Sequence, residues 1–208
     1  MSASFRRTPG FERRNDMVEA TLDCIADLGI TATTVRAVAA RAGVSNGLIR
    51  HHFASKNNLI VAAYRRTIEM MTSPSLDVLE TMQGTPHRRL AYFVAACLAG
   101  PVADPRMLSV WATFISRVRV DEQIAREHHE GYLNFRRASE RIIEEVLAAD
   151  GRRVAAAELE RLGIAVNALI DGLWLEGCLA ENFDEKEQVH IGLRSVEALL
   201  AVELPDPF

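Results

Sequence analysis

The segment between Thr31 and Asn58 constrains the fold most, because it predicts two short helices joined by a glycine turn. In the first helix, small and apolar residues recur at three- and four-residue spacing and form one face: Val35, Val38, Ala39 and Ala42. Gly43 then permits the positive φ of a tight helix exit, and Ser45 is a favourable N-cap for the second helix. This arrangement is typical of a helix-turn-helix, and an ordinary antiparallel helix pair is the alternative.

The charge distribution separates these two interpretations. Residues 1–66 carry ten Lys or Arg and five Asp or Glu, a net charge of +5. The whole chain carries −4, so residues 67–208 carry −9. A basic head on an acidic body suits a protein that docks on DNA with one end only. The acidic body also disfavours a protein that bundles DNA without specificity, because such a protein needs basic charge over its whole surface.

Three stretches in this region match a known pattern: TTVRAVAARAGVS from Thr33, GLIRHHF from Gly47, and SKNNL from Ser55. The chain from about Arg13 to Leu59 resembles the DNA-binding domain of TetR-family repressors. The resemblance implies a three-helix DNA-binding head and a larger all-helical body that dimerises and senses a ligand. Arg50 departs from the family pattern, which often has a Tyr that touches a phosphate. An Arg can serve that phosphate or read guanine bidentately.

The resemblance and the chemistry of helix starts together predict the DNA-contacting residues. Arg36 is expected to reach guanine in the major groove, Asn46 an adenine edge, and Lys56 a phosphate. Leu48 is expected either to contact a thymine methyl group or to be core, and Ser45 has a capping role in either case. The predicted contacts are Thr34, Arg36, Ser45, Asn46, Gly47, Leu48, Arg50, His51, His52 and Lys56.

The remaining sequence predicts helices and no strands, so the expected fold class is all-α. We expect a DNA-binding domain with an N-terminal arm over residues 1–55 and a helical ligand-sensing and dimerisation domain over 56–208. Ser73-Pro74-Ser75 predicts a kink or break in or after the helix that opens at Lys56. The predicted helices are Phe11–Leu28, the helix-turn-helix pair, Lys56 through Met71, His87–Ala99, Pro105–Val118, Asp121–Ala149, Ala155–Ala180 and Asp184–Val202.

The last two predicted helices indicate a homodimer. The segment from Gly163 to Ala180 is apolar nearly all round, and the final helix is apolar on one face. Two such helices from each subunit would form a four-helix bundle, and burial of the first one in a monomer core is the alternative. A two-fold dimer would read a pseudo-palindromic operator in double-stranded DNA, with half-sites about 34–36 Å apart or a multiple of that.

Part of the body carries a second resemblance. The run LIDGLWLE from Leu169 and the stretch SVWATF around Trp111 are similar to the choline-responsive BetI-type repressors, and they contain both Trp residues of the chain. Aromatic faces and a carboxylate hold a quaternary ammonium, which has no proton to donate. The expected inducer is choline or a related small cation; a hydrophobic or drug-like inducer, or Trp residues that only pack, are the alternatives. The predicted ligand residues are Trp111, Phe114, Tyr132, Phe135, Asp171 and Trp174, with Glu176 as an alternative anion.

The sequence favours no catalytic, metal or cofactor site. In the run Glu127-His128-His129-Glu130 the two Glu share a helix face with no His between them, so a solvated face is the better interpretation. No nucleophile elbow or phosphate-binding glycine loop occurs. No apolar run of about 18 residues is present, and the start shows no signal-peptide pattern. The three Cys residues are far apart, so we expect reduced thiols and no disulfide framework. Together these features predict a cytoplasmic, non-membrane protein.

Overall fold

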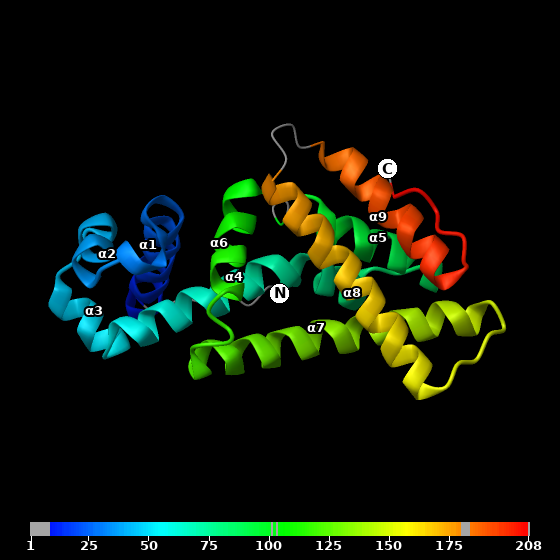
Figure 1. Ribbon diagram of the computed structural model, residues 1–208, viewed down its shortest axis with the longest axis horizontal. Coiled ribbons are helices and arrows are strands. Elements are labelled where there is room, and N and C mark those ends of the chain that lie inside the picture. The colour runs from blue at the N-terminus through cyan, green and yellow to red at the C-terminus, as the bar shows by residue number, and fades with distance from the viewer. Residues whose placement is uncertain (1–8, 101, 103, 180–183, 208) are drawn as a thin grey trace, which may run out of the picture.

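The computed structural model describes residues 9–100, 102, 104–179 and 184–207, and within these ranges it contains nine helices and no strands (Figure 1). The predicted all-α class is confirmed. The helices are α1 Pro9–Ala32, α2 Val35–Ala42, α3 Asn46–Phe53, α4 Lys56–Thr81, α5 Pro86–Leu98, α6 Pro105–Ile115, α7 Glu122–Ala149, α8 Ala156–Leu179 and α9 Glu185–Leu200.

The helix-turn-helix is stabilised by residues at the ends of its two helices, whose side chains accept hydrogen bonds from free backbone N–H groups. The hydroxyl of Thr34 accepts a hydrogen bond from the Ala37 N–H at 3.1 Å, and that of Ser45 accepts one from the Leu48 N–H at 3.2 Å. Gly43, between them, adopts φ 64° and ψ 32°, the left-handed conformation that glycine tolerates best. The predicted glycine exit and Ser45 cap are therefore confirmed.

The head, α1 to α3 with the first turns of α4, has its own core. Ile49 and Phe53 of α3 turn inward, and the Arg14 guanidinium lies 4.9 Å from the centre of the Phe53 ring. The buried members of this core are Met17, Val18, Ala20, Cys24, Val38, Ala39, Ile49, Phe53 and Leu59.

Near Pro74 the sequence predicts a kink or a break. The break is wrong, because α4 runs unbroken from Lys56 to Thr81 with Pro74 inside it, whereas the kink stays a prediction. Pro74 has no N–H to donate to the preceding turn. Two nearby hydroxyls also bond to backbone carbonyls of the same helix: Thr72 donates to the carbonyl of Ile68 and Ser75 to that of Thr72, each at 2.9 Å. Packing of α4 against α5 and α7 holds the helix in place.

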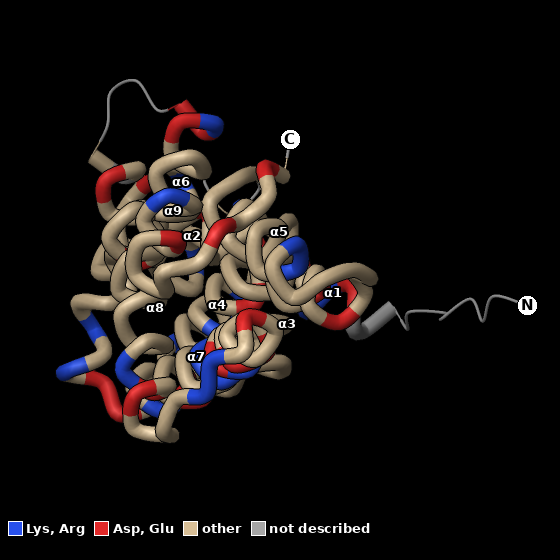
Figure 2. The backbone as a smooth tube through the Cα atoms, turned by 90° about the vertical axis from the view of Figure 1, so that its right-hand side faces the viewer, with Lys and Arg blue, Asp and Glu red and all other residues tan. Residues whose placement is uncertain are grey.

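Helices α4, α5, α7, α8 and α9 enclose the large core of the body, which lies to the right of the head in Figure 1. Helix α4 extends from the head into this body, and α6 stands at the junction. In Figure 2, which views the molecule from the body end, basic and acidic positions are interspersed along the backbone. The net charge of −9 on residues 67–208 is thus spread over the body.

The capping contact of Ser45 generates a prediction about stability. Ser45→Ala removes the acceptor for the Leu48 N–H and should lower the free energy of unfolding by about 1 kcal/mol, whereas Ser45→Gly should cost only a few tenths. Chemical denaturation followed by circular dichroism measures both. Ser73→Ala, an exposed and non-capping Ser inside α4, is the matched control, and an equal loss there would contradict the capping argument.

Candidate ligand cavity and DNA-binding surface

A cavity of about 520 Å³ lies between α4, α6, α7 and α8. Its volume falls within the range of small-molecule sites, and most of its lining is apolar. The lining residues are Ile68, Met71, Thr72, Trp111, Ala112, Ile115, His128, Gly131, Tyr132, Phe135, Asp171, Gly172, Trp174 and Leu175.

Among the six residues predicted for ligand binding, five line this cavity: Trp111, Tyr132, Phe135, Asp171 and Trp174. Phe114 lies elsewhere. It is fully buried in the apolar cluster between head and body, called the junction cluster below, where its ring centre is 4.6 Å from that of Tyr64. The buried members of the junction cluster are Leu22, Ile25, Ile60, Ala63, Tyr64, Val110, Phe114 and Ile124. The alternative anion, Glu176, is exposed and is not among the lining residues.

Asp171 gives the cavity its charge. Burial raises the pKa of its carboxyl to about 6, and the Tyr132 hydroxyl, which hydrogen-bonds to it, opposes that rise. No Lys or Arg is found among the described residues that line the cavity. Burial lowers the pKa of His128, so this imidazole is neutral at pH 7. At neutral pH the cavity therefore carries one negative charge without a built-in cation.

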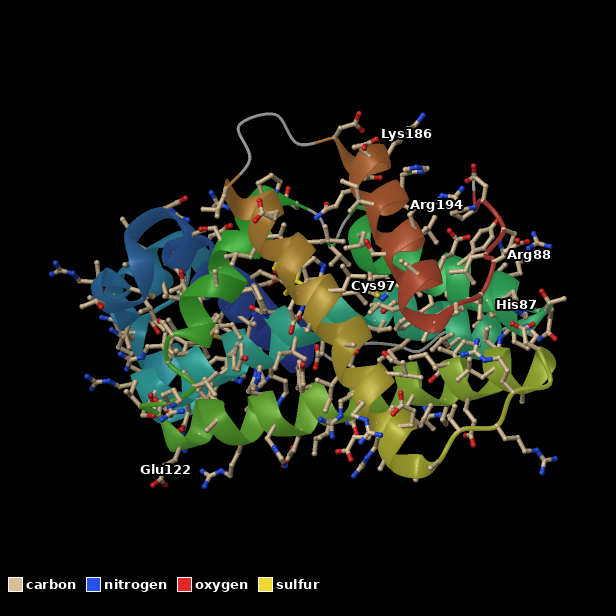
Figure 3. The ribbon with its side chains drawn as sticks, turned by 45° about the vertical axis from the view of Figure 1, so that its right-hand side comes forward. His87, Arg88, Cys97, Glu122, Lys186 and Arg194 are labelled. Carbon is tan, nitrogen blue, oxygen red and sulfur yellow. The ribbon has the colours of Figure 1, made fainter. Side chains whose placement is uncertain are left out.

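Two indole rings meet at the cavity wall. The centres of Trp111 and Trp174 are 5.5 Å apart, and their planes are inclined at 76°. The Trp174 Nε1–H donates to the backbone carbonyl of Cys97 at 2.8 Å, and Figure 3 shows Cys97 inside the body, between α8 and α9 in that view. This bond fixes the Trp174 ring, because a buried indole N–H needs a partner. The aromatic wall is therefore held in place before any ligand arrives.

His128 differs from its sequence interpretation as part of a solvated helix face. It is half-buried, lines the cavity, and its Nδ1 lies 2.7 Å from the Tyr64 hydroxyl oxygen. Its neighbour Glu127 instead accepts a hydrogen bond from Arg65 Nε at 2.8 Å. Nowhere in the described part of the chain do three or more His, Cys, Asp or Glu gather as they would around a metal ion.

Helix α6 connects the cavity to the head through two faces. Trp111, Ala112 and Ile115 line the cavity, while Val110 and Phe114 are buried in the junction cluster with residues of α1 and α4. One turn before Val110 comes Arg106, which extends this second face toward the head.

Arg106 forms ion pairs with α1 of the head. Its Nη1 lies 2.8 Å from Asp27 Oδ1, and its Nη2 lies 3.2 Å from Asp23 Oδ1. The same Asp27 accepts Nη1 of Arg41 in α2 at 2.6 Å. Hydrogen bonds from Arg41 and then Arg106 lower the pKa of Asp27, so this carboxylate remains charged. A displacement of α6 would therefore be transmitted to the helix-turn-helix.

The predicted DNA contacts lie on α2, on α3 and at the residues that cap or open helices. Leu48 and His52 are half-buried, and Leu48 packs against the head core. Lys56 opens α4, and its Nζ lies 3.4 Å from the carbonyl oxygen of Thr31. The eight exposed residues are Thr34, Arg36, Ser45, Asn46, Gly47, Arg50, His51 and Lys56.

The raised pKa of Asp171 generates a prediction about pH-dependent stability. Between the ordinary value of 3.8 and about 6, the folded protein binds more protons at this carboxyl than the unfolded chain does, so stability falls as pH rises through this window. Asp171→Asn should therefore raise the free energy of unfolding by about 3 kcal/mol at pH 7.5, and the gain should shrink toward pH 4.

Urea denaturation across this pH range measures the gain, and Glu176→Gln serves as the control because it neutralises an exposed carboxylate on the same helix. A pH-independent difference between wild type and Asp171→Asn would show that the charge of Asp171 does not destabilise the fold.

Comparisons with known proteins agree with this geometry. Residues 17–63 match the family model for bacterial regulatory proteins of the tetR family, and residues 86–201 match that for the BetI-type transcriptional repressor C-terminal domain. The HTH-type transcriptional regulators BetI of Burkholderia thailandensis and Burkholderia ambifaria are 29% and 30% identical over 190 residues, covering 91% of this chain and 94% of theirs.

Solved structures show the same fold. A protein assigned as a transcriptional regulator from Pseudomonas aeruginosa PAO1 superposes with a TM-score of 0.84 at 30% identity, covering 96% of this chain and 95% of its own. A regulator from Saccharomonospora viridis, solved in complex with choline, superposes at 0.74 with 21% identity, covering 89% and 96%. None of the described helices has the length and apolarity that a membrane crossing requires. The chain belongs to the TetR family of transcriptional regulators, with a C-terminal domain of the BetI repressor type, and not to an enzyme family.

Proposed function

We propose that this protein is a homodimeric repressor of a pseudo-palindromic operator and that a choline-like cation in the body cavity releases it from DNA. Residues 1–55 would form the DNA-binding domain, and residues 56–208 the sensing and dimerisation domain. The family assignment supports the regulatory role, and the cavity supports the chemistry of the inducer.

The observation that carries the proposed inducer is the unopposed carboxylate of Asp171 beside two Trp rings. A small cation would neutralise this carboxylate, and the indole faces would stabilise its charge in the manner of an aromatic cage. An anion would meet repulsion here, because no Lys or Arg is found among the described lining residues. The choline held by the similar regulator of Saccharomonospora viridis belongs to the same class of ligand.

A hydrophobic inducer is the second candidate, and the apolar side of the cavity favours it. Ile68, Met71, Ile115 and Leu175 offer no hydrogen bonds, and a neutral apolar molecule would gain by leaving water. The two candidates differ in what Asp171 contributes. A cationic inducer would be stabilised by the negative charge of Asp171. Binding of an apolar inducer would bury that charge without a partner, which is unfavourable.

Induction would act through α6, which touches both the cavity and the head. A ligand beside Trp111, Ala112 and Ile115 would change the position of this helix, and the ion pairs of Arg106 would carry the change to α1. The coupling is reciprocal, so operator DNA must weaken inducer binding by the factor by which inducer weakens DNA binding.

The proposed homodimer would form through α8 and α9. These helices expose large apolar side chains that the protomer leaves uncovered: Ile164, Leu175, Leu179, Ile191 and Leu199. Uncovered apolar side chains in such number mark an interaction surface. A two-fold pairing of this surface would present two heads to two operator half-sites.

The cationic inducer is tested by calorimetry with choline and with its uncharged isostere, in which carbon replaces nitrogen. Choline should bind the wild type, and the isostere should bind at least about tenfold more weakly, because it lacks the charge that Asp171 stabilises. Asp171→Asn should abolish this preference, whereas Glu176→Gln, outside the cavity lining, should keep it. Equal affinity for the two compounds would favour the hydrophobic inducer instead.

The DNA-binding role is tested by affinity selection of genomic fragments at one fixed salt concentration, followed by sequencing. One or a few pseudo-palindromes should be enriched. Arg36→Ala should reduce the binding preference for guanine at one operator position by about 1–3 kcal/mol. Lys56→Ala should instead weaken binding to all DNA sequences alike and reduce the slope of log affinity against log salt concentration by about one.

The control for these variants is Arg161→Ala, which removes an exposed body Arg paired with Glu158 and should change neither quantity. Fragments recovered without any sequence preference would refute operator recognition.

A further inference from the structure

The entrance of the cavity lies along α8. Of the described residues that line the cavity, only Gly172 and Leu175 are exposed, and the others are buried or half-buried. A Cβ atom added to Gly172 would meet no heavy atom within 4 Å, so the space beside it is open. The side chain of Leu175 is 48% exposed. The protomer therefore leaves its ligand cavity uncovered on this side.

Gly172 and Leu175 also belong to a stripe along α8. Ile164, Ala168, Gly172, Leu175 and Leu179 are spaced by four, four, three and four residues, so they follow one face of the helix, and all five are exposed. Ile164 is 44% and Leu179 71% exposed. Among the exposed and described positions from 162 to 179, Glu176 alone carries a charge. This α8 stripe is thus an uncharged surface that contains the cavity entrance.

A second copy of this chain fits the α8 stripe. Around a two-fold axis the stripe would meet itself, and an uncharged surface can do so without repulsion. The small residues Ala168 and Gly172 at its centre allow two helices to approach closely. Helix α9, which packs against α8, carries two further exposed apolar side chains, Ile191 and Leu199. The α8 stripe carries no positive charge, so it offers no binding surface for DNA.

We propose that the partner subunit covers the cavity entrance, so that each ligand site is complete only in the dimer. This inference rests on the proposed homodimer and extends it, because the residues that would pair the subunits also border the ligand. Ligand binding and dimerisation would then be linked: a ligand enclosed by two subunits stabilises their association, and dissociation exposes the site to water.

Two variants test the inference without touching the cavity lining. Ile164→Lys and Leu179→Lys each place a charge on the α8 stripe at a position outside the lining. Val120→Lys is the matched control, because Val120 is as exposed as Leu179, at 71%, but lies between α6 and α7. Circular dichroism checks folding, and sedimentation velocity measures the oligomeric state. Both α8 variants should be monomers, and wild type and control should be dimers.

The cavity supplies a readout that needs no ligand. The two Trp of the chain, Trp111 and Trp174, both line it, so acrylamide quenching of tryptophan fluorescence reports access to the cavity. The quenching constant should rise at least twofold in the monomeric variants and stay at the wild-type value in Val120→Lys. Choline, used as the probe, should bind the monomers at least tenfold more weakly than it binds the dimer.

The outcomes separate this inference from the proposed inducer. Folded monomers with wild-type quenching would overturn it, because the partner would then not cover the entrance. Variants that remain dimeric, or a wild type that is monomeric at all concentrations tested, would overturn it as well. A dimeric wild type that fails to bind choline would refute the choline-like inducer alone, and the quenching data would still decide whether the entrance is covered.

Discussion

The continuity of α4 is the constraint on which the rest of the structure depends. This one helix supplies Leu59 to the core of the head, Tyr64 to the junction cluster and Met71 to the core of the body. The residue after Met71, Thr72, lines the cavity. A break at Pro74 would free the end of α4 that packs against α5. The surrounding cores therefore enforce a helix that local propensity opposes.

The cavity shows the opposite relation between local preference and fold. A carboxylate in the wall of a mostly apolar cavity is unfavourable when buried, and burial accordingly raises the pKa of Asp171 to about 6. The fold retains the group and surrounds it with rigid aromatic rings, one of them fixed by the hydrogen bond from Trp174 to Cys97. A buried group that lowers the stability of the fold is a candidate functional group, because a bound ligand can recover the free energy that folding loses there.

Local signals in the sequence were sufficient for most of the fold. Ser45 and Gly43 act through their own backbone neighbours, so their roles in the turn could be predicted without knowledge of the tertiary structure. The aromatic and acidic residues of the cavity could be predicted from family resemblance and cation chemistry.

The environment of Phe114 could not be predicted, because it depends on how α6 crosses α4, and this crossing is not encoded in either helix alone. The contributions of Ile68, Thr72 and Gly131 were missed for the same reason, since aliphatic and small residues carry no local sign of a cavity. In particular, Gly131 lets α7 approach α4 closely: an added Cβ there would lie 2.6 Å from Ile68 Cγ2.

The junction between head and body combines two kinds of contact that respond differently to the solvent. The side chains of Arg106 and Asp23 are about half exposed, so dissolved ions screen their attraction. Val110 and Phe114 on the same helix are buried, and salt does not weaken their packing. At high ionic strength the head would thus remain attached through the junction cluster, while the ion pairs that orient the head would weaken. The medium around the protein would then set how firmly each head is aligned with its body.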